Sequence, residues 1–158
     1  MYSKILVPVD GSPTSNRGLD EAIKLARLTS AKLKLLHAVD LVSFAVAPEA
    51  GMAATPELLT LVREGAQYIL DQARARVEAS GLQAETMLVD TFAGRVCDLV
   101  ADEAARWGAD LIVIGTHGRR GVSRLVLGSD AEQIARLAPV PVLLVRGELA
   151  PPLSSAAP

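Results

Sequence analysis

The sequence predicts an α/β protein: a single domain built on an open, parallel, five-stranded sheet with helices on both faces, Rossmann-like in kind. Short apolar runs rich in β-type residues alternate with longer segments whose apolar residues recur at helical spacing. Parallel strands need a crossover connection, which is usually a helix, and these crossovers are right-handed. The 158 residues suit one domain, and half of them are hydrophobic, which is enough to fill a core.

The first part of the chain predicts a strand, a helix and a second strand. The apolar run at residues 5–9 forms the first strand, and the Asp10-Gly-Ser-Pro sequence after it is typical of a turn. Residues 33–40 form the second strand, in which His37 is expected to be packed rather than functional. Between them, residues 15–29 form an amphipathic helix with the apolar positions Leu19, Ala22, Ile23 and Ala26.

The middle of the chain predicts a long connection followed by a long helix. Residues 41–55 are rich in alanine and have no sustained period, so they form either an ordinary surface loop or a mobile lid over the sheet edge. The helix begins with Thr55 as its cap and Pro56 at its first position, and Gly81 ends it. Its apolar face consists of Val62, Ala66, Ile69, Ala73 and Val77.

The remaining elements continue the alternation of strand and helix. Strands are predicted at residues 86–89, 111–114 and 142–145, and helices at residues 96–107 and 129–138. Trp107 is interpreted as a packing residue at a helix end. The tail at residues 148–158 is rich in Pro, Ala and Ser and is predicted to be disordered, so the folded domain covers residues 1–147.

A glycine-rich segment after the fourth predicted strand indicates an anion site. Gly115 and Gly118 precede Gly128 and a helix start. Glycine lets backbone N–H groups approach a ligand closely, and a helix N-terminus favours negative charge, so a phosphate is the natural guest. A purely structural loop is the alternative. Ser129 and Glu132 fit a capping box, which would engage the Ser129 hydroxyl at the helix start, and both interpretations stay open.

The predicted strands bring polar and flexible segments to one edge of the sheet. In open parallel sheets, ligands bind beyond the carboxyl ends of the strands, where the strand order reverses. Asp10, Asp40, residues 90–94 and residues 115–118 all follow or end predicted strands. The sequence therefore predicts one ligand-binding cleft at this edge, lined by an acid and a glycine loop.

This phosphate site is of neither the P-loop nor the dinucleotide-binding type. The sequence lacks G-x-x-x-x-G-K-[ST], and no G-x-G-x-x-G follows the first strand. His117 either hydrogen-bonds a phosphate or points to solvent. The arginines of the loop either contact ligand or form solvated surface, and they are Arg119, Arg120 and Arg124.

Composition and motifs narrow the class of protein. A net charge of −2, with no basic run and few aromatic residues, disfavours nucleic-acid binding. The chain opens without a cationic leader and has no apolar run near roughly 18 residues, which predicts a cytoplasmic protein with no membrane partner. The single cysteine, Cys97, is expected to be a buried small hydrophobe. Asp10 is the best candidate acid, but the sequence contains no recognised catalytic constellation, which favours binding over catalysis.

These residues resemble the universal stress protein family. The GTHG sequence at residues 115–118, followed after nine residues by Gly128 and Ser129, resembles the family's nucleotide motif G-x2-G-x9-G-[ST]. The opening VPVDGS segment from Val7 and the closing PVPVLLV segment resemble the family's first and last strands. The resemblance extends over residues 3–146, essentially the whole predicted domain.

The resemblance implies a sheet of order 3-2-1-4-5, a cytoplasmic homodimer joined through the last strand at residues 140–146, and bound ATP with Mg²⁺ held through its phosphates. No side chain is expected to bind the metal directly. The residues that would meet adenine and ribose are Pro8, Val9 and Asp10, with Ala38 and Val39 as a wall for the adenine. The phosphates would be held by Gly115, His117, Gly118, Gly128 and Ser129, and the predicted site is completed by Ile114 and Asp130.

Three functions follow as hypotheses. The first is an ATP-binding stress-response protein, a regulatory module in which nucleotide occupancy changes residues 41–55 or the dimer. The second is a slow ATP hydrolase or nucleotidyl-transfer enzyme, in which Asp10 or Asp130 orients metal or water. The third is a nucleotide-independent dimeric scaffold. The sequence does not distinguish ATP from ADP or AMP.

Overall fold

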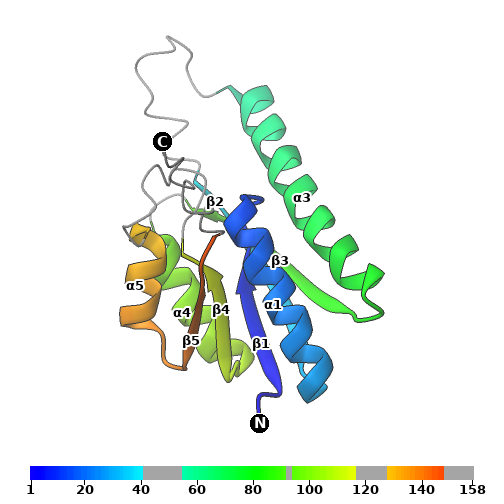
Figure 1. Cartoon of the computed structure of the whole chain (residues 1–158). Helices are drawn as coiled ribbons and strands as arrows, with labels where there is room; N and C mark the ends of the chain where they lie inside the picture. The colour runs from blue at the N-terminus through cyan, green and yellow to red at the C-terminus, as the bar shows by residue number, and fades with distance from the viewer. Residues whose placement is uncertain (41–54, 92–93, 117–127, 148–158) are drawn as a thin grey trace, which may run out of the picture.

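The computed structural model describes residues 1–40, 55–91, 94–116 and 128–147, and in this part of the chain strands and helices alternate (Figure 1). In chain order the elements are β1 (Lys4–Pro8), α1 (Pro13–Thr29), β2 (Lys32–Asp40), α3 (Pro56–Ala79), β3 (Ala84–Thr91), α4 (Val96–Trp107), β4 (Leu111–Gly115), α5 (Ser129–Leu137) and β5 (Val142–Val145). The strands form one sheet of order β3-β2-β1-β4-β5, and every neighbouring pair is parallel. The predicted fold class and strand order are confirmed. The predicted loop or lid and the predicted tail lie outside the described residues.

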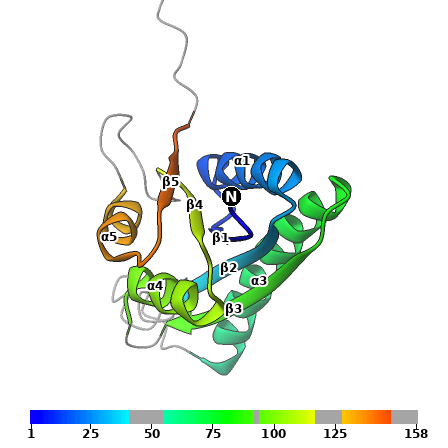
Figure 2. The same ribbon diagram turned by 90° about the horizontal axis from the view of Figure 1, so that it is seen from below.

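The sheet is covered on both faces, because α1 and α3 pack on one side and α4 and α5 on the other (Figure 2). Alternate residues of β1 point to opposite faces, so Ile5 and Val7 join the core under α1 and α3, whereas Leu6 joins the core under α4 and α5. No helix in the described ranges is long and apolar enough to cross a membrane.

The helix α1 begins two residues earlier than the apolar pattern predicts. Ser12 is the N-cap, and its hydroxyl oxygen accepts a hydrogen bond from the backbone N–H of Ser15 at 3.2 Å. Pro13 takes the first helical position, where its missing N–H costs nothing. The four predicted apolar positions of this helix are all buried, as expected.

The start of α3 is predicted correctly. The Thr55 hydroxyl oxygen accepts a hydrogen bond from the backbone N–H of Leu58, and Pro56 is the first helical residue. The apolar face of α3 was predicted only in part, because Leu70, which was not predicted, is 1 % exposed, whereas the predicted Ile69 is half-buried.

The third strand, β3, is longer than the predicted residues 86–89, because β2 pairs with it over its whole length.

The capping box, one of the two interpretations of the start of α5, is not formed in the structure. Gly128, which has no side chain to cap the helix, is the N-cap, and Ser129 is the first helical residue. The Glu132 carboxylate pairs instead with Arg136, one turn further along the helix, at 2.8 Å. The Gly128 N–H donates to the carbonyl of Thr116 at 2.8 Å, so a contact with the end of β4 fixes where this helix begins.

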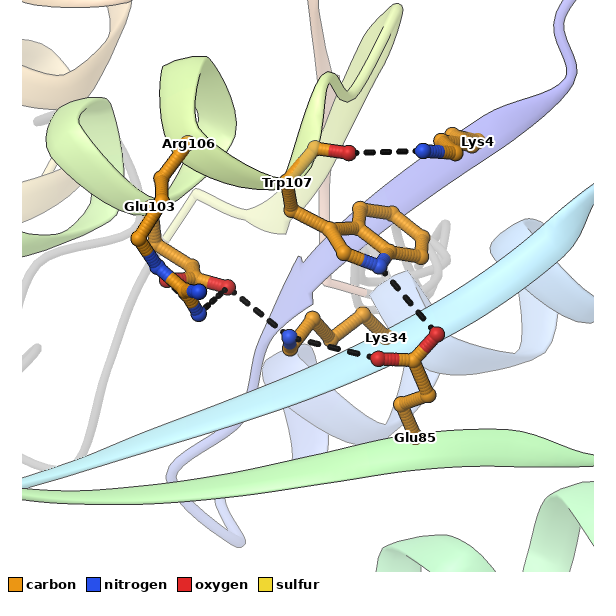
Figure 3. A network of polar contacts seen from close by, with 6 residues as sticks. All are labelled: Lys4, Lys34, Glu85, Glu103, Arg106 and Trp107. Carbon is orange, nitrogen blue, oxygen red and sulfur yellow. Dashed lines mark hydrogen bonds and ion pairs between the residues drawn. The ribbon is translucent and has the colours of Figure 1, made fainter.

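Charged residues form a network near the amino ends of the strands, at the edge of the sheet opposite the predicted ligand-binding cleft (Figure 3). Lys34 of β2 and Glu103 of α4 are an ion pair at 2.9 Å, and their side chains are 9 % and 3 % exposed. Arg106 makes two further hydrogen bonds to the Glu103 carboxylate, at 2.7 and 2.8 Å. Glu85 of β3 lies 3.3 Å from the Lys34 ammonium. No motif or spacing in the sequence predicts this network.

Trp107 belongs to the same network, so it does more than pack at a helix end. Its indole N–H donates to Glu85 at 3.2 Å, and its carbonyl accepts from Lys4 at 2.8 Å. The ammonium groups of Lys4 and Lys34 lie 5.3 and 5.5 Å from the ring centroid, within cation–π range. Burial raises the pKa of Glu85, but its hydrogen bonds from Trp107 and Lys34 outweigh burial, and the net pKa is lowered.

Candidate functional site

The turn after β1 holds Asp10 in a fixed conformation at the carboxyl ends of the strands, the carboxyl edge of the sheet. The Asp10 Oδ1 atom accepts a hydrogen bond from the backbone N–H of Ser12 at 2.9 Å, and the backbone N–H of Asp10 donates to the Ser15 hydroxyl at 3.1 Å. Gly11 takes a φ of +78°, a left-handed conformation that suits glycine. The orientation of Asp10 is therefore determined by the first turn of α1.

The ends of β1 and β2 are joined by hydrogen bonds that place the predicted adenine-contacting residues side by side. The Val9 N–H donates to the carbonyl of Leu36 at 2.8 Å, and Nδ1 of His37 lies 2.6 Å from the Val9 carbonyl oxygen. Because a carbonyl only accepts, the ring nitrogen is the donor. His37 is 6 % exposed, so the prediction of a packed histidine is confirmed. Val39 is 5 % exposed and Ala38 is half-buried.

The end of β4 lies in close contact with the first turn of α1. A Cβ atom added to Gly115 would stand 2.6 Å from the Thr14 carbonyl oxygen and 2.9 Å from the Ser15 backbone nitrogen. A Cβ atom added to Gly18 would stand 3.0 Å from the Gly115 nitrogen. Residue 115 must therefore be glycine so that β4 can pack against the backbone of α1. The sequence predicted Gly115 only as a phosphate-binding residue, and Gly18 was not among the predicted site residues.

Backbone hydrogen bonds tie the two ends of the glycine-rich segment together. The Thr116 N–H donates to the carbonyl of Val145 at 2.9 Å, and the Thr116 carbonyl accepts from the N–H of Gly128 at 2.8 Å. The end of β4, the end of β5 and the start of α5 therefore meet at one point. His117, Gly118 and the predicted loop arginines lie outside the described residues.

The start of α5 presents backbone amides at the carboxyl edge. Gly128 is half-buried, and Ser129 and Asp130 are exposed. Since the N-cap residue Gly128 has no side chain that could cap the helix, the first-turn N–H groups fit the kind of donor that holds phosphate. Asp130 and Glu132 add negative charge to that turn, although Glu132 is paired with Arg136.

Asp90 and Cys97, two further acidic or nucleophilic residues near this edge, lie in structural surroundings. Asp90 of β3 accepts hydrogen bonds from Arg63 at 2.6 and 3.0 Å, and this hydrogen bonding raises the pKa of the Arg63 guanidinium. Cys97 is 1 % exposed, as predicted, and burial followed by the nearby Asp98 carboxylate raises the pKa of its thiol. The described residues contain no group of three or more side chains able to hold a metal ion.

The described part of the predicted site therefore converges on three neighbouring strands. Pro8, Val9 and Asp10 stand at the end of β1, with β2 on one side and β4 on the other. Ile114 and Gly115 end β4, and Gly128 is bonded to the residue after it. Ser12 and Ser15, whose hydroxyl groups hold the Asp10 turn, are not among the predicted site residues. Two serines in a helix-start sequence were the only signal for them.

The fold and this edge define a class: a parallel α/β domain of the Rossmann-like kind, with a helix N-terminus and an acid beside its central strands. The chain belongs to the universal stress protein family, whose sequence model matches residues 1–146.

Individual relatives resemble the chain over nearly its whole length. Universal stress protein YxiE of Bacillus subtilis is 31 % identical over 151 residues, covering 92 % of this chain and all of the relative. Among solved structures, MJ0577 of Methanocaldococcus jannaschii superposes with a TM-score of 0.77 at 25 % identity, covering 95 % of this chain and 99 % of the other. A universal stress protein in complex with cAMP superposes with a TM-score of 0.64 at 28 % identity, covering 93 % of this chain and 98 % of the other.

Proposed function

We propose that this protein binds ATP at the carboxyl edge of its sheet and acts as a regulatory nucleotide-binding module in a stress response. The observation that carries the proposal is the meeting of the Asp10 turn, the Gly115 end of β4 and the Gly128 start of α5 at one edge. The related structure with cAMP adds support, because that ligand is also an adenine nucleotide.

Each part of the edge suits one part of the nucleotide. Pro8, Val9, Ala38 and Val39 are apolar residues, which suit the flat adenine ring, and a carboxylate such as Asp10 suits ribose hydroxyls. Backbone N–H groups at the start of α5 suit phosphates. In this proposal Mg²⁺ is held through the phosphates and supplies charge neutralisation there. The roles of His117 and Gly118 rest on the sequence motif alone.

The Asp10 turn favours binding over hydrolysis. A general base needs a carboxylate oxygen within reach of the attacking water. One oxygen of Asp10 already accepts the Ser12 N–H, which suits a group that orients a ligand. Phosphate release that survives extensive purification and disappears in Gly118→Ala would favour the hydrolase instead. Partner interactions unchanged by Gly118→Ala and Gly128→Ala would favour the scaffold.

Denaturing freshly purified protein should release an adenine nucleotide, detected by mass spectrometry. The double variant Gly118→Ala, Gly128→Ala should release none, and its affinity for ATP in equilibrium dialysis should fall at least about tenfold. Gly65→Ala is the matched control, because a Cβ atom there meets nothing within 4 Å. Failure of the native protein to bind any adenine nucleotide at millimolar concentration would rule the proposal out.

The proposal includes a cytoplasmic homodimer joined through residues 140–146. The β5 strand stands at the edge of the sheet, and Leu143 and Leu144 are each 37 % exposed, so an apolar strand edge is available for pairing.

Leu144→Asp should convert a dimer to a monomer in analytical ultracentrifugation at micromolar concentration, because a charge at a pairing edge opposes association. Leu28→Asp, at a position of α1 that is 78 % exposed, should leave the dimer intact. A native chain that sediments as a monomer, or a Leu144→Asp variant that remains dimeric, would contradict this interface.

A further inference from the structure

We infer that Ser15 is the positioning residue of the ribose half of the site: its hydroxyl fixes Asp10, and it thereby sets the preference for a ribose 2′-hydroxyl. This inference rests on the proposed function. Ser15 belongs to neither the glycine motif nor the opening strand, and it lies on the first turn of α1.

Ser15 holds Asp10 through a closed set of hydrogen bonds. Its hydroxyl accepts the backbone N–H of Asp10 at 3.1 Å, and its own N–H donates to the Ser12 hydroxyl at 3.2 Å. The backbone N–H of Ser12 in turn donates to the Asp10 Oδ1 atom at 2.9 Å. Both the backbone and the carboxylate of Asp10 are therefore fixed by two serines that are 7 % and 6 % exposed.

Ser15 is also held from the side of β4. The Cβ position of Gly115 lies 2.9 Å from the Ser15 nitrogen and 2.6 Å from the preceding carbonyl oxygen of Thr14. The Cβ position of Gly18, one turn along the helix, lies 3.0 Å from the Gly115 nitrogen. The absence of side chains at these two glycines lets α1 approach β4 closely, so Ser15 contacts the Gly115 backbone and Asp10 at once.

The requirements of helix α1 alone do not call for a hydroxyl at this position. The N-cap role belongs to Ser12, and serine is only a moderate helix former inside a helix. A nearly buried hydroxyl needs a hydrogen-bond partner, and the N–H of Asp10 supplies it. Alanine would leave that N–H without its acceptor and free the turn to change conformation.

The test compares Ser15→Ala and Ser15→Thr with the native protein in binding assays with ATP, 2′-deoxy-ATP and AMP. The native protein should prefer ATP over 2′-deoxy-ATP by about tenfold or more, as expected for a hydroxyl bonded to a charged group. In Ser15→Ala this preference should fall to within about twofold, while the preference for ATP over AMP, which reports the phosphate half, stays unchanged. Ser15→Thr keeps the hydroxyl and should restore the preference.

Hydrogen exchange of the unliganded protein gives a second readout. The Asp10 amide should exchange at least about tenfold faster in Ser15→Ala, because its acceptor is gone. Thr29→Ala is the control, since it removes a hydroxyl that donates to Leu25 at the far end of the same helix. It should change neither readout.

The outcomes separate the inference from the proposed function. Native protein that binds no adenine nucleotide overturns both. Native protein that binds ATP with a ribose preference that Ser15→Ala retains overturns only the inference. An equal loss of affinity for all three nucleotides in Ser15→Ala would show a general structural role and would also overturn the inference.

Discussion

Replacing Gly115 by alanine should destabilise the protein by about 2–3 kcal/mol, which lowers Tm by roughly 4–12 °C for a chain of this size. The new Cβ atom would lie 2.6 Å from the Thr14 carbonyl oxygen and 2.9 Å from the Ser15 nitrogen. Both atoms are backbone, so no side chain can rotate away, and α1 must shift. Because Ser15 holds Asp10, nucleotide affinity should fall as well. Thermal unfolding and ATP titration measure the two effects.

The control is the same substitution at an open position. Gly65 lies on the exposed face of α3, and a Cβ atom there meets nothing within 4 Å. Gly65→Ala should therefore stabilise the protein by about 0.5–1 kcal/mol through helix propensity alone. The two glycine-to-alanine changes should have opposite signs. A Gly115→Ala variant as stable as the native protein would contradict the packing argument.

Local patterns predicted those elements whose ends are set by their own residues. The start of α3 depends on Thr55 and Pro56, which act within one turn, and the structure has the predicted cap. The short apolar run of β5 is also found at its predicted residues. The strand order, by contrast, came from resemblance to a family, because periodicity does not say which strands are neighbours.

Predictions failed where a distant residue decides. The start of α5 is set by the hydrogen bond from Gly128 to Thr116, across the glycine-rich segment, and this bond overrides the Ser129 capping pattern. Gly18 resembles an ordinary weak point in a helix until β4 is placed beside it. The role of Ser15 was not predicted for the same reason, because its hydroxyl group has a hydrogen-bond partner only once the turn before the helix brings Asp10 to it.

The network at the opposite edge illustrates a further limit of sequence reasoning. Lys34 lies between apolar neighbours in β2, and Glu103 lies 69 residues (103 − 34) further along the chain. Nothing in the sequence joins them. In the structure they form a 2.9 Å pair covered by α4, with side-chain exposures of 9 % and 3 %. At the protein surface, Arg106 forms a further ion pair with Glu103, and Glu85 forms a further ion pair with Lys34.

Replacing one partner of the Lys34–Glu103 pair should lower the free energy of unfolding strongly, whereas replacing both partners should change it little. Lys34→Met leaves Glu103 buried with one partner fewer, and Glu103→Leu leaves Lys34 in the same position. Each single change should cost about 3 kcal/mol, because a buried charge loses its main compensation. The double variant places two apolar side chains together and should be within about 1 kcal/mol of the native protein. The expected coupling between the two sites is therefore large.

Urea denaturation of the native protein, both single variants and the double variant measures this coupling. Trp107 is the only tryptophan, and its ring lies 5.5 Å from the Lys34 ammonium, so its fluorescence reports unfolding beside the pair. Arg74→Met is the control, because its partner Glu78 is 50 % exposed and Arg74 itself is 54 % exposed. That change should cost less than about 0.5 kcal/mol. Additive effects of Lys34→Met and Glu103→Leu would mean that the two charges do not stabilise one another. Coupling of the expected size would show that Glu103, which α4 brings to Lys34, offsets much of the cost of burying that lysine in the sheet.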